Sequence, residues 1–316
     1  MKFITSYLAS LPLLLAATLG SESVLAIDLP ATLYGKINIS YDMVKDAENN
    51  WASNASRLGV KGSYELDTDL AVVYQLEQEV DYAHGRNNIN TLFSMRNSFV
   101  GVKGNFGTVF FGINDTPFKL AQNKVDVFND QIGDIKNIVV DEIRAADSWF
   151  YHSPKLASGF ALQAAYVPAD SVFSSSQSVF VSYDIGDLFL GLGLDSDMRR
   201  NDRSVSSTKV YDSVRGVVQY KLESWQFGLL LQSSERQKVA AADKEFSYSF
   251  SVTKEIEDLT FKVQHGNSDI VVEDLRSTLV GVDYDVAKNT KVYAYYWDYN
   301  IGEHANVISV GFEYKF

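Results

Sequence analysis

The chain has 316 residues, no cysteine and a formal net charge of -12. The lack of cysteine excludes disulfide bonds and metal-thiolate sites, and the acidic balance argues against nucleic acid as a partner. Phenylalanine (19 residues) and tyrosine (18) far outnumber tryptophan (4), and there are only 5 prolines. A composition that is rich in aromatic residues and poor in proline favours long strands.

Residues 1–26 predict a secretory signal peptide. The basic Lys2 precedes an apolar stretch from Leu8 to Leu19, and small residues end the segment at Ala26. This order is typical of a cleaved leader, so we expect an exported mature chain that begins at Ile27. A membrane-anchoring helix is the alternative, although the apolar stretch is short for a span.

Apolar residues at every second position predict strands with one apolar and one polar face along the mature chain. In the second half, for example, Phe246, Tyr248 and Phe250 alternate with serines. Many of these strands run about ten residues, which suits a tilted crossing of a bilayer better than a soluble sandwich. The pattern gives about sixteen strands, at 32–42, 57–66, 70–80, 94–104, 107–113, 147–155, 160–167, 177–185, 188–196, 212–223, 225–233, 244–254, 258–267, 274–285, 290–299 and 305–316.

The connections between these strands alternate between tight turns and longer loops. Asp67–Asp69 and Ala287–Asn289 are tight, whereas 81–93, 114–146 and 197–211 are long. Short turns on one rim, long loops on the other and an even strand number indicate a closed antiparallel transmembrane β-barrel. We therefore predict an all-β fold, in which residues 27–316 form one barrel domain with a multi-pass membrane topology.

The longest connection, 114–146, carries little strand alternation and many carboxylates, so it is either functional or a wrongly assigned segment. If it folds into the barrel, its carboxylates face basic residues on the polar side of the first strands, and the opposed charges form a constriction. The alternative is that the loop projects outward and its acids only solvate it. The candidate basic residues are Lys36, Arg57, Arg96 and Arg144, and the candidate acidic residues are Asp126, Asp130 and Asp134.

No catalytic motif stands out in the sequence. It lacks a G-x-S-x-G elbow, a P-loop, a G-x-G-x-x-G loop and an H-E-x-x-H pair. The four histidines, His84, His152, His265 and His304, have no metal-ligand spacing. We therefore predict that the protein is not an enzyme and needs no cofactor or metal.

Several stretches of the mature chain carry a family resemblance. They are LYGKINISYD, RLGVKGSYELDTDLAVVYQLE, RNSFVGVKGNFGTVFFGINDTPF, Tyr151-His152-Ser153-Pro154 with Gly159-Phe160, and the terminal GFEYKF. These stretches resemble the general-diffusion porins of Gram-negative outer membranes, of the proteobacterial type. The resemblance implies a sixteen-stranded barrel, a homotrimer in outer-membrane lipid, and a long third loop folded into the lumen as a constriction.

The resemblance also assigns roles to individual residues. Lys36, Arg57 and Arg96 match positions of the family's basic cluster, whereas Arg144 matches less closely because its spacing to DSWFYHSP differs. The loop lacks the family's Pro-Glu-Phe-Gly-Gly tip and offers Asp126, Asp130 and Asp134 instead. The terminal alternation of Phe312, Tyr314 and Phe316 resembles the signal that the outer-membrane assembly machinery reads.

These observations predict an outer-membrane channel for passive diffusion of small hydrophilic solutes and ions. From the overall acidity we expect a weak preference for cations, which the basic wall could reverse. A substrate-specific outer-membrane channel is the first alternative, and it would need aromatic or arginine residues along the lumen path. A barrel enzyme is the second alternative, and it would need a serine and histidine pair.

Overall fold

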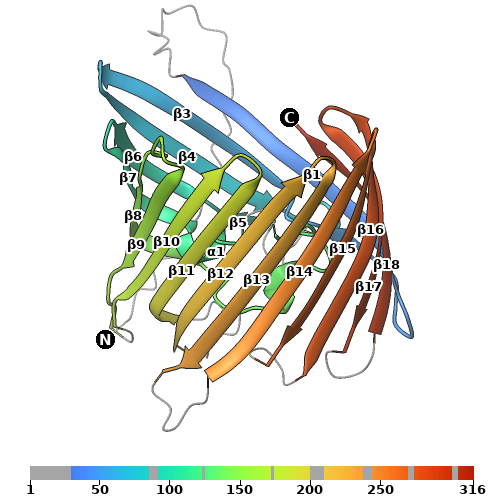
Figure 1. Cartoon of the computed structure of the whole chain (residues 1–316). Coiled ribbons are helices and arrows are strands. Elements are labelled where there is room, and N and C mark those ends of the chain that lie inside the picture. Colours follow the sequence, from blue (N-terminus) through green and yellow to red (C-terminus); the bar gives the residue numbers. More distant parts are fainter. Residues whose placement is uncertain are drawn as a thin grey trace, which may run out of the picture.

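The computed structural model describes residues 30–84, 92–122, 125–171, 174–199, 210–237, 244–269, 274–300 and 305–316, which form an antiparallel β-barrel (Figure 1). The predicted signal peptide, residues 1–26, lies outside the described residues. In Figure 1 the short turns lie at the upper rim of the barrel.

The wall consists of strand segments that follow one another along the chain. These are β1 Ala31–Val44, β2 Asn50–Ser53, β3 Arg57–Asp67, β4 Leu70–Val80, β5 Phe93–Met95, β6 Ser98–Gly104, β7 Gly107–Asp115, β8 Arg144–His152, β9 Phe160–Val167, β10 Ser176–Ile185, β11 Leu188–Arg199, β12 Val210–Leu222, β13 Trp225–Arg236, β14 Lys244–Ile256, β15 Leu259–Ser268, β16 Leu275–Ala287, β17 Thr290–Tyr299 and β18 Ala305–Lys315.

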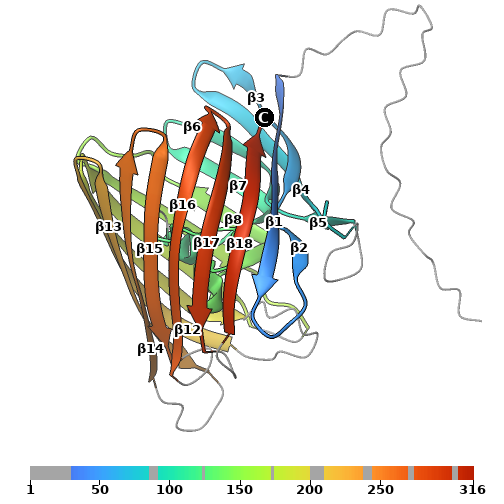
Figure 2. The same cartoon turned by 90° about the vertical axis from the view of Figure 1, so that its right-hand side faces the viewer.

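The barrel is closed by β1, which pairs antiparallel with β18 on one side and with β3 on the other. In Figure 2 the blue β1 lies beside the red β18. Two wall strands are interrupted, because β2 and β3 both pair with β1, and β5 and β6 both pair with β4. In the described ranges, the eighteen segments therefore occupy sixteen strand positions, which confirms the predicted strand number.

The two faces of the wall have the polarity expected of a membrane barrel. On β13 and β14 the outward Leu229, Leu231 and Phe250 are exposed, whereas the inward Gln232 and Ser249 are buried. Aromatic side chains such as Tyr220, Trp225 and Tyr284 are exposed near strand ends, where amphipathic rings settle at the membrane interface. Within the described residues, neither of the two short helices is long and apolar enough to cross a membrane.

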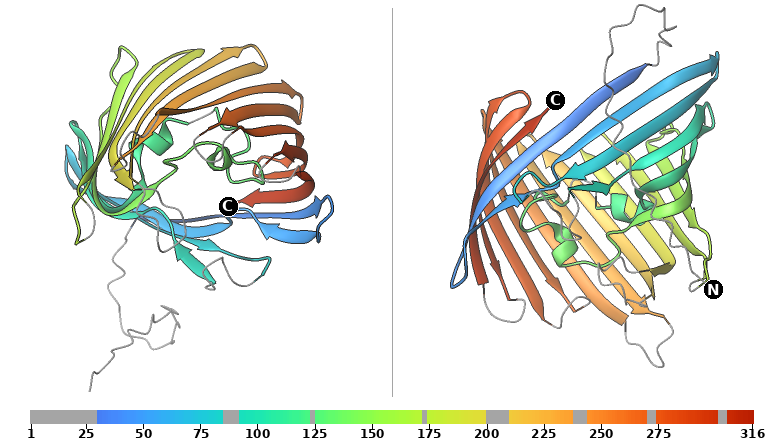
Figure 3. Two further views of the ribbon diagram at one scale, coloured as in Figure 1. Left: turned by 90° about the horizontal axis from the view of Figure 1, so that it is seen from below. Right: turned by 180° about the vertical axis from the view of Figure 1, so that it is seen from behind.

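The long connection between β7 and β8 lies inside the barrel (Figure 3), as predicted. It spans 116–143 and contains α1 (Pro117–Leu120) and a 3-10 helix, η1 (Ile135–Asn137). Its apolar side chains pack against the inner wall where glycines leave room for them, so the connection is fastened to the far side of the lumen. The contacts are Phe118 at Gly193, Val125 at Gly228, Ile138 at Gly266 and Phe128 at Gly281.

The bounds of the connection are narrower than the predicted 114–146. β7 continues to Asp115, and β8 begins at Arg144 instead of the predicted residue 147. The register of the β7–β8 ladder shifts between Gly112 and Asn114. A bulge of this kind breaks the alternation that the sequence pattern depends on, so the pattern missed the first residues of β8.

Candidate functional site: a charged constriction

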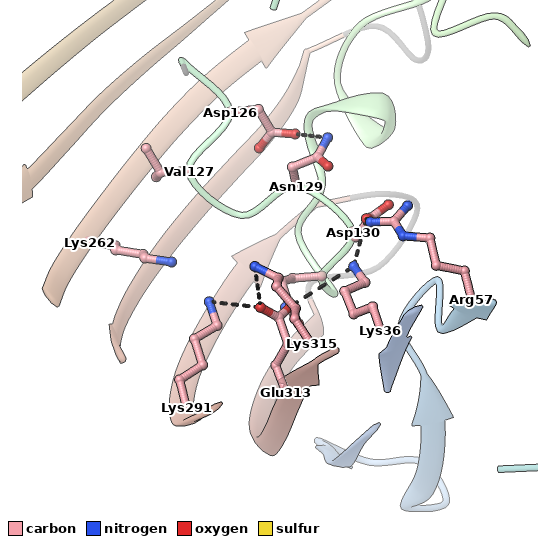
Figure 4. A pocket seen from close by; sticks show the side chains of 11 residues that line it. Lys36, Arg57, Asp126, Val127, Asn129, Asp130, Lys262, Lys291, Glu313 and Lys315 are labelled. Carbon is pink, nitrogen blue, oxygen red and sulfur yellow. Dashed lines mark hydrogen bonds and ion pairs between the residues drawn. The ribbon is translucent and has the colours of Figure 1, made fainter. Parts of the chain in front are cut away.

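Asp130 ties the tip of the inward connection to the wall. Lys36 on β1 is the register partner of Arg57 on β3, so the two cations lie side by side. Lys36 Nζ and Arg57 Nη2 both contact Asp130 Oδ2, at 2.8 Å and 2.9 Å (Figure 4). Asp130 has a φ of 61°, a left-handed conformation that Asp tolerates better than most residues.

The two cations decide the protonation state of Asp130. Burial alone would raise its pKa, but the nearby charges of Lys36 and Arg57 dominate and hold the pKa well below its ordinary value of 3.8. The carboxylate is therefore ionised throughout the physiological range. Its negative charge is shared between two positive groups, so the contact as a whole carries a positive surplus.

Arg96 and Arg144 lie on the neighbouring wall but pair with carboxylates of the wall itself. Arg96 contacts Glu77 at 2.8 Å and Glu79 at 2.7 Å. Arg144 contacts Asp115 at 3.1 Å, and its Nε donates to Asn97 Oδ1 at 2.7 Å. All four predicted basic residues thus lie on the part of the wall that runs from β1 through β3 to β8, with Arg96 in the break between β5 and β6. Two of them, Lys36 and Arg57, touch a carboxylate of the inward connection.

Asp126 and Asp134 shape the connection from within. Asp126 accepts hydrogen bonds from the backbone N–H groups of Phe128 (3.2 Å) and Ile135 (3.3 Å). Asp134 caps η1 by accepting from Lys136 N at 2.9 Å, and it also accepts from Asp130 N at 3.0 Å. Burial, followed by the nearby charge of Asp134, raises the pKa of Asp126 well above its ordinary value. Neither carboxylate contacts the predicted basic residues.

Arg215 is a buried arginine that the sequence analysis did not single out. It lies on β12, is fully buried, and fastens both ends of the connection. Its Nη1 contacts Glu142 at 2.7 Å and the Phe118 carbonyl at 3.1 Å, and its Nη2 donates to the Val140 carbonyl at 3.1 Å. Gln232 Oε1 accepts from the same guanidinium at 2.7 Å.

A second group of cations, which we call the lysine cluster, consists of Lys262 on β15, Lys291 on β17 and Lys315 on β18. Together with Lys36 and Arg57 these lysines line a hollow of ≈ 220 Å³ beside Asp130 (Figure 4). Sequence analysis did not identify them. Lys262 lies between the outward Phe261 and Val263, so its phase alone would have placed it on the inner face.

The terminal aromatic residues lie on the outside of the barrel. Phe312, Tyr314 and Phe316 are each about 40% exposed at the end of β18. The Phe316 carbonyl accepts a hydrogen bond from Gly35 N on β1 at 2.9 Å, so the end of the chain takes part in closing the wall.

The closed barrel with an apolar exterior, a polar interior and an inward connection defines a membrane barrel of the porin class. The chain matches the family model described as Gram-negative porin over residues 13–302. It therefore belongs to the Gram-negative porin family, which confirms the resemblance that the sequence motifs indicated. Family membership and outer-membrane relatives place the protein in the outer membrane.

Individual relatives match part of the chain. It is 31% identical to the major outer membrane protein P.IB of Neisseria gonorrhoeae over 185 residues, which are 53% of this chain and 51% of that protein. It is 28% identical to P.IB of Neisseria sicca over 194 residues, or 55% and 53% of the two chains. The chain thus spans about half the length of these relatives.

Solved structures share the fold. The anion-selective porin from Comamonas acidovorans superposes with a TM-score of 0.72 at 19% identity, covering 90% of this chain and 99% of that one. OmpF of Salmonella typhi gives 0.70 at 15% identity, covering 91% and 98%. The trimer form of OmpT from Vibrio cholerae gives 0.68 at 18% identity, covering 90% and 99%.

Proposed function

We propose that the protein forms a water-filled channel for passive diffusion of small hydrophilic solutes and ions across the outer membrane. The observation that carries this proposal is the connection 116–143, which crosses the lumen and is fastened to the far wall by buried side chains. An inward loop of this kind narrows the pore without closing it and sets a size limit. We infer a channel that catalyses no reaction.

We propose that Lys36, Arg57, Arg96 and Arg144 with Asp130 form the charged constriction. Asp126 and Asp134 contribute indirectly, because their hydrogen bonds fix the shape of the connection that carries Asp130. The opposed but unequal charges of this ring act on every solute that passes.

The charge balance at the constriction favours anions, because Lys36 and Arg57 share the single charge of Asp130. The wall carboxylates Glu77, Glu79 and Asp115 are matched by Arg96, Arg144 and Lys119. Among the described residues of the connection only Asn129 and Lys136 are exposed, and neither is acidic. Residues 116–143 contain five acidic and three basic residues, so most of the chain's net charge of -12 lies outside the connection. At an ionic strength of 0.1 M the Debye length is about 10 Å, so distant acidic rims are screened and the constriction decides selectivity. We expect a weak preference for anions, opposite to the preference that the overall acidity suggested.

Single-channel recording of refolded residues 27–316 in a planar bilayer tests this function. We expect open channels that close in three equal sublevels, because we propose a homotrimer, and a reversal potential that favours chloride in a salt gradient. Folded protein that remains silent would contradict a diffusion channel. A reversal potential that favours the cation would leave the channel standing and contradict the inferred charge balance.

A second prediction separates two neighbouring carboxylates of the connection. Asp130→Asn should shift the reversal potential further toward anions, whereas Asp126→Asn, the matched control, should leave it nearly unchanged. Because the pKa of Asp130 is depressed, its charge is present above its unfolded-state value of 3.8 and is lost only as the pH falls through its lower folded-state pKa. The difference between wild type and Asp130→Asn should therefore persist from about pH 8 to about pH 5. A difference that vanished within this interval would contradict the assignment.

We also propose the route by which the barrel reaches the membrane. Residues 1–26 serve as the signal peptide, and the exposed Phe312, Tyr314 and Phe316 serve as the signal for the outer-membrane assembly machinery.

The alternative function, a substrate-specific channel, is favoured by one observation, the lysine cluster beside the constriction.

A further inference from the structure

Three ammonium groups converge on one carboxylate beside the constriction. Glu313 on β18 is contacted by Lys315 Nζ at 2.9 Å, and by Lys36 and Lys291 Nζ at 3.9 Å each (Figure 4). Lys291 and Glu313 are register partners on β17 and β18, which explains why their side chains share one space. The carboxylate of Glu313 therefore marks a position at which a negatively charged group is surrounded by three ammonium donors.

The charges around this position do not balance. Lys262 and Lys291 share Asp283, at 2.6 Å and 2.8 Å, while Lys36 and Arg57 share Asp130. The hollow is thus surrounded by five cations and three ion-paired carboxylates. The cations are Lys36, Arg57, Lys262, Lys291 and Lys315, and the carboxylates are Asp130, Asp283 and Glu313. Asp126 also lines the hollow, but its carboxylate accepts from backbone N–H groups of the connection and contacts none of these cations. The ion-paired groups around the hollow therefore carry a surplus of two positive charges.

The hollow is accessible from the lumen. The side chain of Lys315 is 62% exposed, and those of Arg57 and Lys291 are 22% and 20% exposed. Lys291 is the second residue of β17 and follows a tight turn, so it lies near the short-turn rim. A solute that passes the constriction meets these groups without any rearrangement of the wall.

We propose that this hollow is a binding subsite for a compact oxyanion of about two negative charges, with the chemistry of phosphate. Ammonium groups are point-charge donors that form short charge-assisted hydrogen bonds to oxygen in any direction, which suits a tetrahedral oxyanion. The surplus charge favours a dianion over chloride, and Glu313 competes with it, which keeps binding weak enough for release. This inference rests on the proposed channel function and assigns that channel a preferred solute class.

Conductance in inorganic phosphate at about pH 8, measured on the full mature barrel, tests the proposal. Wild type should show phosphate conductance that saturates with concentration, while chloride conductance rises nearly linearly. Lys291→Gln should raise the half-saturating phosphate concentration by about threefold to tenfold, the range expected when one partly screened charge is removed. Glu313→Gln should lower it by a similar factor. Lys221→Gln, on β12 away from the hollow, makes the same charge change and should leave it unchanged.

The outcomes separate this proposal from the channel function. Normal steps in potassium chloride without saturation in phosphate would overturn the subsite and leave the channel intact. An equal shift in Lys291→Gln and Lys221→Gln would overturn it too, because general lumen charge would then explain the effect. The absence of steps in any salt would contradict the channel itself.

Discussion

Deletion of residues 120–138, with the ends joined by a short glycine and serine linker, is expected to raise the single-channel conductance at least about twofold, because the loop sets the narrowest cross-section. The deleted segment includes Phe128, Ile135 and Ile138, which are fully buried inside the barrel. Their removal empties part of the lumen rather than part of the wall. Single-channel recording in a planar bilayer measures the effect.

The barrel itself should survive this deletion. The hydrogen-bond ladder from β1 round to β18 closes without any residue of the segment, and a closed ladder leaves no unpaired edge. Retained heat-modifiable migration in gel electrophoresis would verify folding. A variant in which 120–138 is replaced by a polar linker of equal length is the control, and it should conduct at noisy intermediate levels. Unchanged conductance in the deletion variant would place the segment outside the solute path.

The fold was largely predictable because a two-residue period is a local signal. The strands predicted at 225–233, 244–254 and 305–316 correspond to β13, β14 and β18, with the same first residues. Each of these strands has a lipid-facing apolar side and a small polar side, so every residue adds to the pattern. The start of β8 was missed because the bulge opposite it changes the phase.

The proposed constriction was predictable only in part, because an irregular loop has no period. Asp126, Asp130 and Asp134 look equivalent in sequence, yet backbone N–H groups capture two of them, and the left-handed backbone of Asp130 points the third at the wall. For Lys291 the inward phase can be read from the sequence. Its height along the barrel cannot, because that depends on the register between β17 and β18.

Substitution Arg215→Ala is expected to detach the connection from the wall. The guanidinium holds Glu142 and the carbonyls of Phe118 and Val140, and it is fully buried. Removal of one partner of a buried ion pair leaves an uncompensated charge and costs about 3 to 5 kcal/mol. This free energy destabilises attachment of the connection to the wall, since the side chain of Arg215 takes no part in the hydrogen bonds between the wall strands. We expect noisy, enlarged conductance and cleavage of the connection by added protease.

The excess current noise of Arg215→Ala should depend on pH in a defined direction. Burial raises the pKa of Glu142, although the charge of Arg215 partly opposes the rise. Without Arg215 the pKa should rise further. A carboxyl whose folded-state pKa is raised favours the attached loop while it is protonated, and this support is lost as the pH rises through that pKa. Arg215→Ala should therefore be noisier at about pH 8 than at about pH 5.

A double substitution distinguishes loss of the ion pair from loss of packing. Arg215→Ala with Glu142→Gln removes both charges of the pair. The current noise of this double variant should therefore fall most of the way back to that of wild type, and its pH dependence should disappear. Glu142→Gln alone is the matched control and should increase the current noise less than Arg215→Ala does. If the double variant were as noisy as the single one at every pH, contact of Arg215 with the Phe118 ring at 4.3 Å would be the dominant anchor instead. Either result identifies what keeps an inward loop in place inside a wet barrel.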